Sequence, residues 1–191
     1  MTKLIVGQLQ GVSNTITMPA GHAFAAPGSI VQVIYHRTDA RVNFSAPASG
    51  NGTPITDLAV GIAPRKANSL ILLRWMVNGE MHHDTVFTLQ MNGDLIDIPG
   101  YQGYNNVAGN VRWSGVASGR YDRDQDTTPS NWFIQYAIPA YNINYRTYNL
   151  GVKGSSGTAY TFSLNKGINN TAPTSGYEAL VSTGVALELA Q

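Results

Sequence analysis

Turn-forming residues recur about every 8–12 positions along this chain, with short apolar or alternating segments between them. This spacing is typical of a β-sandwich or barrel, because a strand needs few residues while a stable helix needs a longer periodic run. No helix longer than two turns is predicted. The strongest local signal is Asn92-Gly93, which follows the alternating segment from Thr85 to Met91 and predicts a tight hairpin. The sequence therefore predicts an all-β fold.

About ten strands are predicted, all rich in β-branched, leucine or aromatic residues. The most apolar of them, Leu70 to Val77, is predicted to be buried on both faces of its sheet, and Asn78-Gly79 to form the turn after it. Pro64 and Pro139 are expected to end strands, since proline cannot donate to a strand ladder. The predicted strands are residues 30–35, 41–44, 55–62, 70–77, 85–91, 95–98, 132–136, 145–152, 159–164 and 184–189.

Composition excludes several classes of function. Charged residues make up 12% of the 191 residues and the net charge is +1, so no strong field attracts nucleic acid or an anionic membrane. The chain has no cysteine, which excludes disulfides, cysteine zinc sites and thiol catalysis. No apolar run is long enough for a signal peptide or a membrane helix. We expect a protein that is made in the cytoplasm of the producing cell and does not insert into a membrane.

Two segments differ from the predicted strands. Residues 1–29 carry few strand signals and are predicted to be an N-terminal arm or attachment segment, followed by a β-sandwich domain over residues 30–191. The apolar residues that would attach the arm are Leu4, Ile5, Val6, Ile16 and Met18.

Residues 100–130 form a long segment rich in glycine, asparagine and aromatic residues. Segments of this length without periodicity are usually functional or ordered by a partner. Tyrosine and tryptophan offer a flat apolar face and a polar group, which suits contact with sugars or proteins. The candidate receptor or glycan contacts are Tyr101, Tyr104, Trp113 and Tyr121. The alternative is that these rings fold back onto the sandwich or fill a subunit interface.

Two clusters have metal-ligand chemistry. His82 and His83 are adjacent, so in a strand they would point to opposite faces; they would bind metal only between symmetry-related copies, and a polar hairpin end is the plainer interpretation. Asp122, Asp124 and Asp126 match the first ligands of a calcium loop, but the glycine and the final glutamate of that loop are missing. A solvated charged turn is the alternative.

Catalysis has little support in the sequence. The nucleophile elbow, the zinc-protease helix motif and the phosphate-binding loop are all absent. Only 11 acidic residues are present, and several fall at predicted hairpin ends rather than in facing pairs. We expect no catalytic residues and no cofactor.

Several short motifs follow one another in order between residues 26 and 191. They are residues 26–33, 68–73, 87–93, 136–139, 162–165 and 182–190. In order and spacing they resemble the jelly-roll module of virion structural proteins of tailed bacteriophages, which occurs in tail-fibre distal domains and in stand-alone virion proteins. Met91 replaces a common arginine and Ala137 a common acidic residue of that module.

The resemblance implies a jelly-roll β-sandwich that forms a homotrimer on the virion exterior and has no shared catalytic residues. The expected function is either a tail-fibre or adhesion tip, or a capsid decoration or head-fibre protein. The expected partners are copies of the chain itself, other virion structural proteins and, in the adhesion version, a host surface glycan. The alternatives are a stand-alone carbohydrate-binding module or lectin and, less favoured, an enzyme such as a glycan depolymerase.

Overall fold

The computed structural model describes residues 26–48, 50–96, 115–119, 128–154, 157–169 and 178–191. Within these residues the long elements are all β-strands, and the helical element is the short 3-10 turn η2 (Thr56–Leu58). Every strand pair is antiparallel, and the strands form two sheets of six. The predicted all-β class is therefore confirmed.

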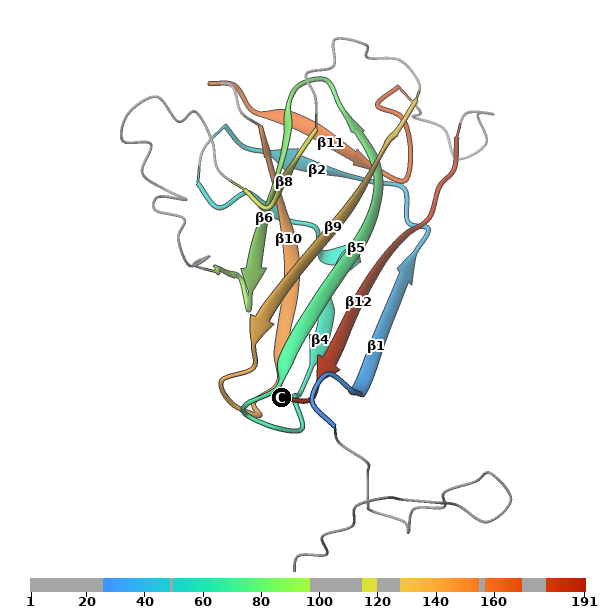
Figure 1. The fold of residues 1–191 in the computed structure, drawn as a ribbon. Helices are drawn as coiled ribbons and strands as arrows, with labels where there is room; N and C mark the ends of the chain where they lie inside the picture. Colours follow the sequence, from blue (N-terminus) through green and yellow to red (C-terminus); the bar gives the residue numbers. More distant parts are fainter. Residues whose placement is uncertain (1–25, 49, 97–114, 120–127, 155–156, 170–177) are drawn as a thin grey trace, which may run out of the picture.

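The first sheet has a body of four strands side by side, in the order β1, β12, β5 and β9 (Figure 1). These are β1 (Ile30–Thr38), β12 (Ser182–Leu189), β5 (Leu70–Met81) and β9 (Ser130–Pro139). The upper end of β5 also pairs with β11 (Tyr160–Leu164). β11 in turn pairs with β2 (Val42–Ala46), the last strand of this sheet.

The second sheet lies behind the first in Figure 1 and is built around β10 (Arg146–Gly154) and β6 (Thr85–Met91). Short strands pair with the outer edges of this pair. They are β3 (Thr53–Pro54), β4 (Val60–Ile62), β7 (Asp94–Leu95) and β8 (Ala117–Ser118).

Strand pairing follows a nested order along the chain. β1 pairs with β12, β2 with β11, β3 and β4 with β10, β5 with β9, and β6 with both β7 and β8. Each strand of the first half thus meets its counterpart in the second half, as in one long antiparallel ribbon. Further pairs, β12 with β5 and β6 with β10, close this ribbon into the two sheets.

The core lies between the sheets and holds large side chains from both. The largest fully buried ones are Trp75, Tyr148, Phe87 and Phe162. Trp75 Nε1 donates a 3.0 Å hydrogen bond to the carbonyl of Leu58, so its polar end is also satisfied.

Three details differ from the sequence prediction. Residues 55–62 are not one strand: a 3-10 turn precedes β4, because residues i and i+3 of such a turn share a side, which lets Ile55 and Leu58 both be buried. Asn78 and Gly79 form no turn but lie inside β5, where a Cβ on Gly79 would meet the Phe162 ring at 2.5 Å. The strand is also not buried on both faces, since Arg74 is exposed.

The predicted hairpin after β6 is confirmed. Asn92 and Gly93 have φ values of 54° and 93°, and a type I′ turn requires positive φ at both central residues. Asn92 also accepts a 2.9 Å hydrogen bond from the Thr147 amide through its side-chain oxygen, which ties the turn to β10.

Candidate functional site

Most of the residues predicted for a site lie outside the described part of the chain. These are the aromatic candidates Tyr101, Tyr104, Trp113 and Tyr121, the acidic candidates Asp122, Asp124 and Asp126, and the arm residues Leu4, Ile5, Val6, Ile16 and Met18. Their roles stay predictions.

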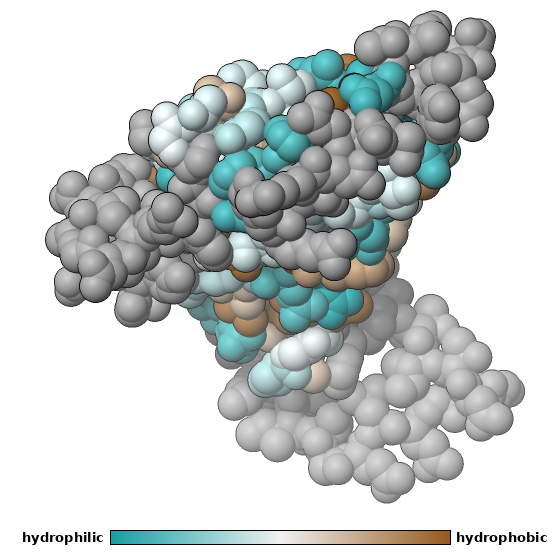
Figure 2. All heavy atoms as spheres, turned by 90° about the horizontal axis from the view of Figure 1, so that it is seen from above, coloured by the Kyte–Doolittle hydropathy of each residue, from teal (hydrophilic) through white to brown (hydrophobic). Residues whose placement is uncertain are grey.

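His82 and His83 form the bend between β5 and β6, at the upper end of the sandwich in Figure 1. Both rings pack on Tyr160: His83 stacks on it with 4.7 Å between ring centroids, and His82 meets it edge-on at 6.2 Å. In the described residues, no group of three or more histidine, aspartate or glutamate side chains could hold a metal ion. Viewed onto this end, the described atoms are mostly hydrophilic or intermediate (Figure 2). This geometry favours a polar hairpin end.

The most unusual surface is the outer face of the four-strand body β1-β12-β5-β9, which we call the open face. Inward residues such as Ile71 and Leu73 alternate with residues that point away from the core. These outward residues line up across the strands. One row holds Val33, Leu187, Leu72 and Ala137; the next Tyr35, Val185, Arg74 and Gln135; the third Arg37, Thr183, Met76 and Phe133.

Large apolar side chains on the open face are well exposed. The exposed fraction is 51% for Val33, 62% for Tyr35 and 79% for Phe133. A hollow of about 370 Å³ runs between Arg74, Val185 and Phe133. A single exposed apolar residue is ordinary, but a continuous apolar patch on one face marks an interaction surface.

Charge on the open face has one sign. The three rows contain Arg37 and Arg74 and no carboxylate. Arg74 lies on a central strand and donates a 2.8 Å hydrogen bond from Nε to Gln135 Oε1, inside its own row. The open face is therefore apolar with a positive centre.

The composition of β5 and β12 explains why this face is apolar. β5 begins Leu-Ile-Leu-Leu-Arg-Trp-Met-Val, so both of its sides are apolar except at Arg74. Strands of this kind are usually covered on both sides. The sequence prediction that both faces of this strand are buried is wrong for a single copy of the chain. The apolar run behind that prediction nevertheless marks the face that no described residues cover.

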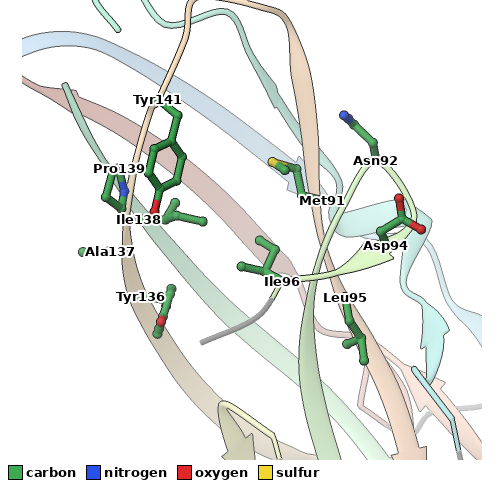
Figure 3. A pocket seen from close by; sticks show the side chains of 10 residues that line it. All are labelled: Met91, Asn92, Asp94, Leu95, Ile96, Tyr136, Ala137, Ile138, Pro139 and Tyr141. Carbon is green, nitrogen blue, oxygen red and sulfur yellow. The ribbon is translucent and has the colours of Figure 1, made fainter. Parts of the chain in front are cut away.

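A slot opens at the β9 edge of the open face. Its volume is about 350 Å³, and it lies between the end of β9 and the β6–β7 hairpin. Figure 3 shows Tyr141 on one side of the slot and Met91 and Ile96 on the other. Asn92 and Asp94 add polar groups at the hairpin.

The loop from β9 to β10 beside the slot is held by Arg146, which is only 5% exposed. Its guanidinium donates to the carbonyls of Ala140, Asn142 and Asn144. These bonds fix a backbone that displays three large apolar residues. They are Tyr141, Ile143 and Tyr145, with exposed fractions of 70%, 60% and 68%.

Tyr141 has a φ of 60°, a left-handed conformation that costs energy in a residue with a bulky side chain. The sequence prediction missed this loop, since its bonds run from one side chain to nearby carbonyls and leave no periodic signal.

A buried carboxylate fixes the lower end of the open face. Glu188 is fully buried and accepts hydrogen bonds from the Gln32 amide group, the Ser69 hydroxyl and the backbone amides of Arg65 and Lys66. Burial alone would raise the pKa of this carboxyl, but the four donors together hold the pKa below its usual value. The carboxylate thus holds the β4–β5 loop against β12.

The outer face of the second sheet has the opposite character. Thr88 and Gln90 point away from the core yet are 1% exposed, because the segment before β3 covers them. The Thr88 hydroxyl donates to Asn51 O at 2.6 Å, and Gln90 Nε2 donates to Asn51 O at 3.0 Å and Gly52 O at 3.1 Å. Lys153 donates to Gly50 O at 3.3 Å, and burial lowers the pKa of its amine. We call this surface the covered face.

No protein-family model matches the chain, and no curated protein matches it at a significant level. What the chain does is therefore inferred from its own residues. Among those that the structure describes, no helix has the length and apolar character needed to span a membrane.

Proposed function

We propose that the chain is a non-enzymatic structural protein on the exterior of a bacteriophage virion, a jelly roll that acts as a homotrimer. It serves either as a tail-fibre or adhesion tip or as a capsid decoration or head-fibre protein. The observation that carries the proposal is a nested two-sheet sandwich whose one outer face is apolar and open.

The nested pairing supports the jelly-roll part of the proposal. A jelly roll is a double-sheet antiparallel architecture built from two Greek keys, and wrapping one long ribbon produces it. The pairs β1–β12, β4–β10, β5–β9 and β6–β7 follow such a ribbon from its ends to its tip. Residues 87–93, 136–139 and 182–190, which carry the resemblance to the phage module, fall on the β6 hairpin, the end of β9 and β12.

The open face supports self-association. Its apolar rows gain free energy when they leave water, roughly 25 cal/mol for each Å² of apolar surface. A structural protein without a catalytic centre uses such a face for assembly. Copies of the same chain are the partner available wherever the protein is made.

Charge favours a ring over a face-to-face pair. A two-fold axis through the middle of the open face would place Arg74 against Arg74 of the second copy, with both charges out of water and no carboxylate beside them. In a three-fold ring the copies meet edge to edge, because each copy offers a different surface to the next one, and Arg74 lies on a central strand rather than at those edges. Three copies form the ring that the resemblance implies.

The position of residue 26 suits an attachment role for the preceding segment. Gly28 N donates to Ala190 O at 2.7 Å and Ala190 N to Ser29 O at 2.9 Å, so this part of the chain lies at the lower end of the sandwich in Figure 1. An arm before residue 26 would leave from that end, and we propose that it docks on the virion.

Two experiments test this function. Light scattering of the purified protein at micromolar concentration should report a trimer. Immunogold labelling of intact particles of the phage that encodes the chain should place the protein on the exterior, at the head or at the tail tip. A monomer in solution together with absence of the protein from purified particles would contradict the proposal.

Saccharide binding is a second candidate, favoured by the slot. Tyr136 and Tyr141 offer ring faces and hydroxyls, while Asn92 and Asp94 offer polar groups to sugar hydroxyls. A panel of neutral hexoses, titrated in a calorimeter, should show binding that Tyr141→Ala abolishes and Tyr145→Ala preserves. No heat with any sugar would remove this candidate and leave the structural role.

A further inference from the structure

The two edges of the open face carry exposed residues of complementary chemistry. At one edge, β1 presents Val33, Tyr35 and the exposed Arg37. At the other edge, β9 presents Phe133, whose exposed fraction of 79% is the highest among the exposed large hydrophobic residues that the structure describes. A guanidinium over an aromatic ring is attractive, and the attraction grows as water is excluded.

Strand register places these residues at equal heights. Arg37, Thr183, Met76 and Phe133 form one row across the sheet, and Val33, Leu187, Leu72 and Ala137 form another. A rotation axis parallel to the strands moves a copy sideways without changing these heights. In a ring with the open faces turned inward, Arg37 of one copy therefore lies level with Phe133 of the next.

Strand direction is also compatible. Each neighbouring pair in β1-β12-β5-β9 is antiparallel, so β1 and β9 run in opposite directions. The two edges would meet as antiparallel neighbours. Such a contact covers unpaired backbone groups that an exposed edge strand otherwise offers to other chains.

We propose that the β1 edge of one copy packs against the β9 edge of the next, with Arg37 over the Phe133 ring and Val33 beside Ala137 and the slot. The occupant of each edge is thus a second copy of this chain, in a head-to-tail arrangement that closes as a ring. This inference rests on the proposed function, because it names the residues through which the proposed homotrimer assembles.

Cross-linking tests the contact directly. The chain contains no cysteine, so Arg37→Cys and Phe133→Cys placed on one chain report only on each other. Within a copy two strands separate them, about 14 Å in all, which a short bis-maleimide does not span. We expect a covalent trimer on a denaturing gel, and no cross-linked species with either single variant. Arg37→Cys paired with Thr161→Cys, on an exposed position of β11, is the matched control and should give no ladder.

A charge exchange gives an independent test by sedimentation equilibrium. Phe133→Lys sets two cations against each other and should weaken the trimer at least about tenfold, as loss of a central interface ring does. Adding Arg37→Glu should recover most of the lost affinity between copies, while Phe133→Leu should change the trimer association constant far less.

The two hypotheses fail in different ways. If the wild-type protein is a trimer, but the Arg37→Cys/Phe133→Cys variant forms no cross-link and the charge exchange leaves the trimer association constant unchanged, this edge contact is overturned and the proposed function stands. A monomeric wild-type protein would overturn both.

Discussion

The two outer faces of the sandwich show opposite relations between polarity and exposure. On the covered face, Thr88, Gln90 and Lys153 are polar yet 1%, 1% and 5% exposed. On the open face, Val33 and Phe133 are apolar yet 51% and 79% exposed. An isolated soluble domain would normally have the reverse arrangement, with its apolar residues inside.

The two faces differ in which segment covers them. The covered face is polar because carbonyls of residues 50–52 accept hydrogen bonds from its side chains, and such directional bonds suit a fixed segment of the same chain. The open face is mostly apolar, with two arginines, Gln135 and Thr183 among its rows, and its one side-chain hydrogen bond described above joins Arg74 to Gln135. We infer that its cover comes from other copies.

The largest expected effect is on assembly. Val33→Asp places a carboxylate on the open face, where it would be buried beside apolar residues of a neighbouring copy. We expect the trimer to weaken at least about thirtyfold, or about 2 kcal/mol, in sedimentation equilibrium, with little change in Tm under monomeric conditions. Thr161→Asp, on exposed β11, should leave the trimer intact; an unchanged trimer in Val33→Asp would mean that this face is not the interface.

The next largest effect is expected at Glu188, a buried residue of β12. Glu188→Gln removes a charge that four donors surround and should lower the unfolding free energy by about 2 kcal/mol at neutral pH. Because the folded pKa of Glu188 lies below the usual 4.5, its stabilisation is present above about pH 4.5 and is lost as the pH falls through the folded pKa.

The unfolding free energies of wild type and Glu188→Gln, measured by denaturant titration, should therefore converge at acid pH. Glu178→Gln, at an exposed position, is the control and should match wild type at all pH values. If the difference in unfolding free energy between wild type and Glu188→Gln stays constant down to strongly acid pH, the carboxylate does not act through its charge.

A matched pair of glutamines compares the faces directly. Gln90→Ala removes the side-chain donor to the Gly52 carbonyl and one of the two donors to the Asn51 carbonyl, and should cost about 1.5 kcal/mol of unfolding free energy. Gln135→Ala removes an exposed partner of Arg74 and should cost under about 0.5 kcal/mol. Equal losses in urea denaturation would contradict the contrast between a covered and an open face.

The smallest effect is at Lys153. Burial disfavours its ammonium, so Lys153→Met should leave stability at pH 7 unchanged or raise it by up to about 1 kcal/mol. The folded pKa is lowered, so the unfolded chain binds more protons and wild-type stability should rise with pH between the folded pKa and about 10.4. Thermal unfolding over that range should show this rise, and Lys153→Met should lack it.

Much of the fold was predictable because alternation and turn chemistry act locally. Asn92-Gly93 has the two positive φ values that its residue types favour, and the strands on either side follow from it. Asn78-Gly79 has the same residue types but lies inside β5, where both residues pair with β9 and Phe162 packs where a side chain on Gly79 would lie. That contact joins residues far apart in sequence, so no local pattern contains it.

The candidate site was less predictable for a related reason. An apolar run such as Leu70 to Val77 indicates that both sides of a strand are covered, but not whether the cover is the same chain or another copy. The loop that displays Tyr141 depends on bonds from Arg146 to carbonyls, which leave no mark in hydropathy. The aromatic candidates between residues 101 and 121 lie outside the described residues and stay predictions.

The most direct test of the central claim is sedimentation equilibrium of the unmodified chain at micromolar concentration. Assembly through the open face predicts a single species of three times the 20.5 kDa chain mass. A species of 20.5 kDa that persists across the whole concentration range would show that the open face needs no second copy, and would contradict the account.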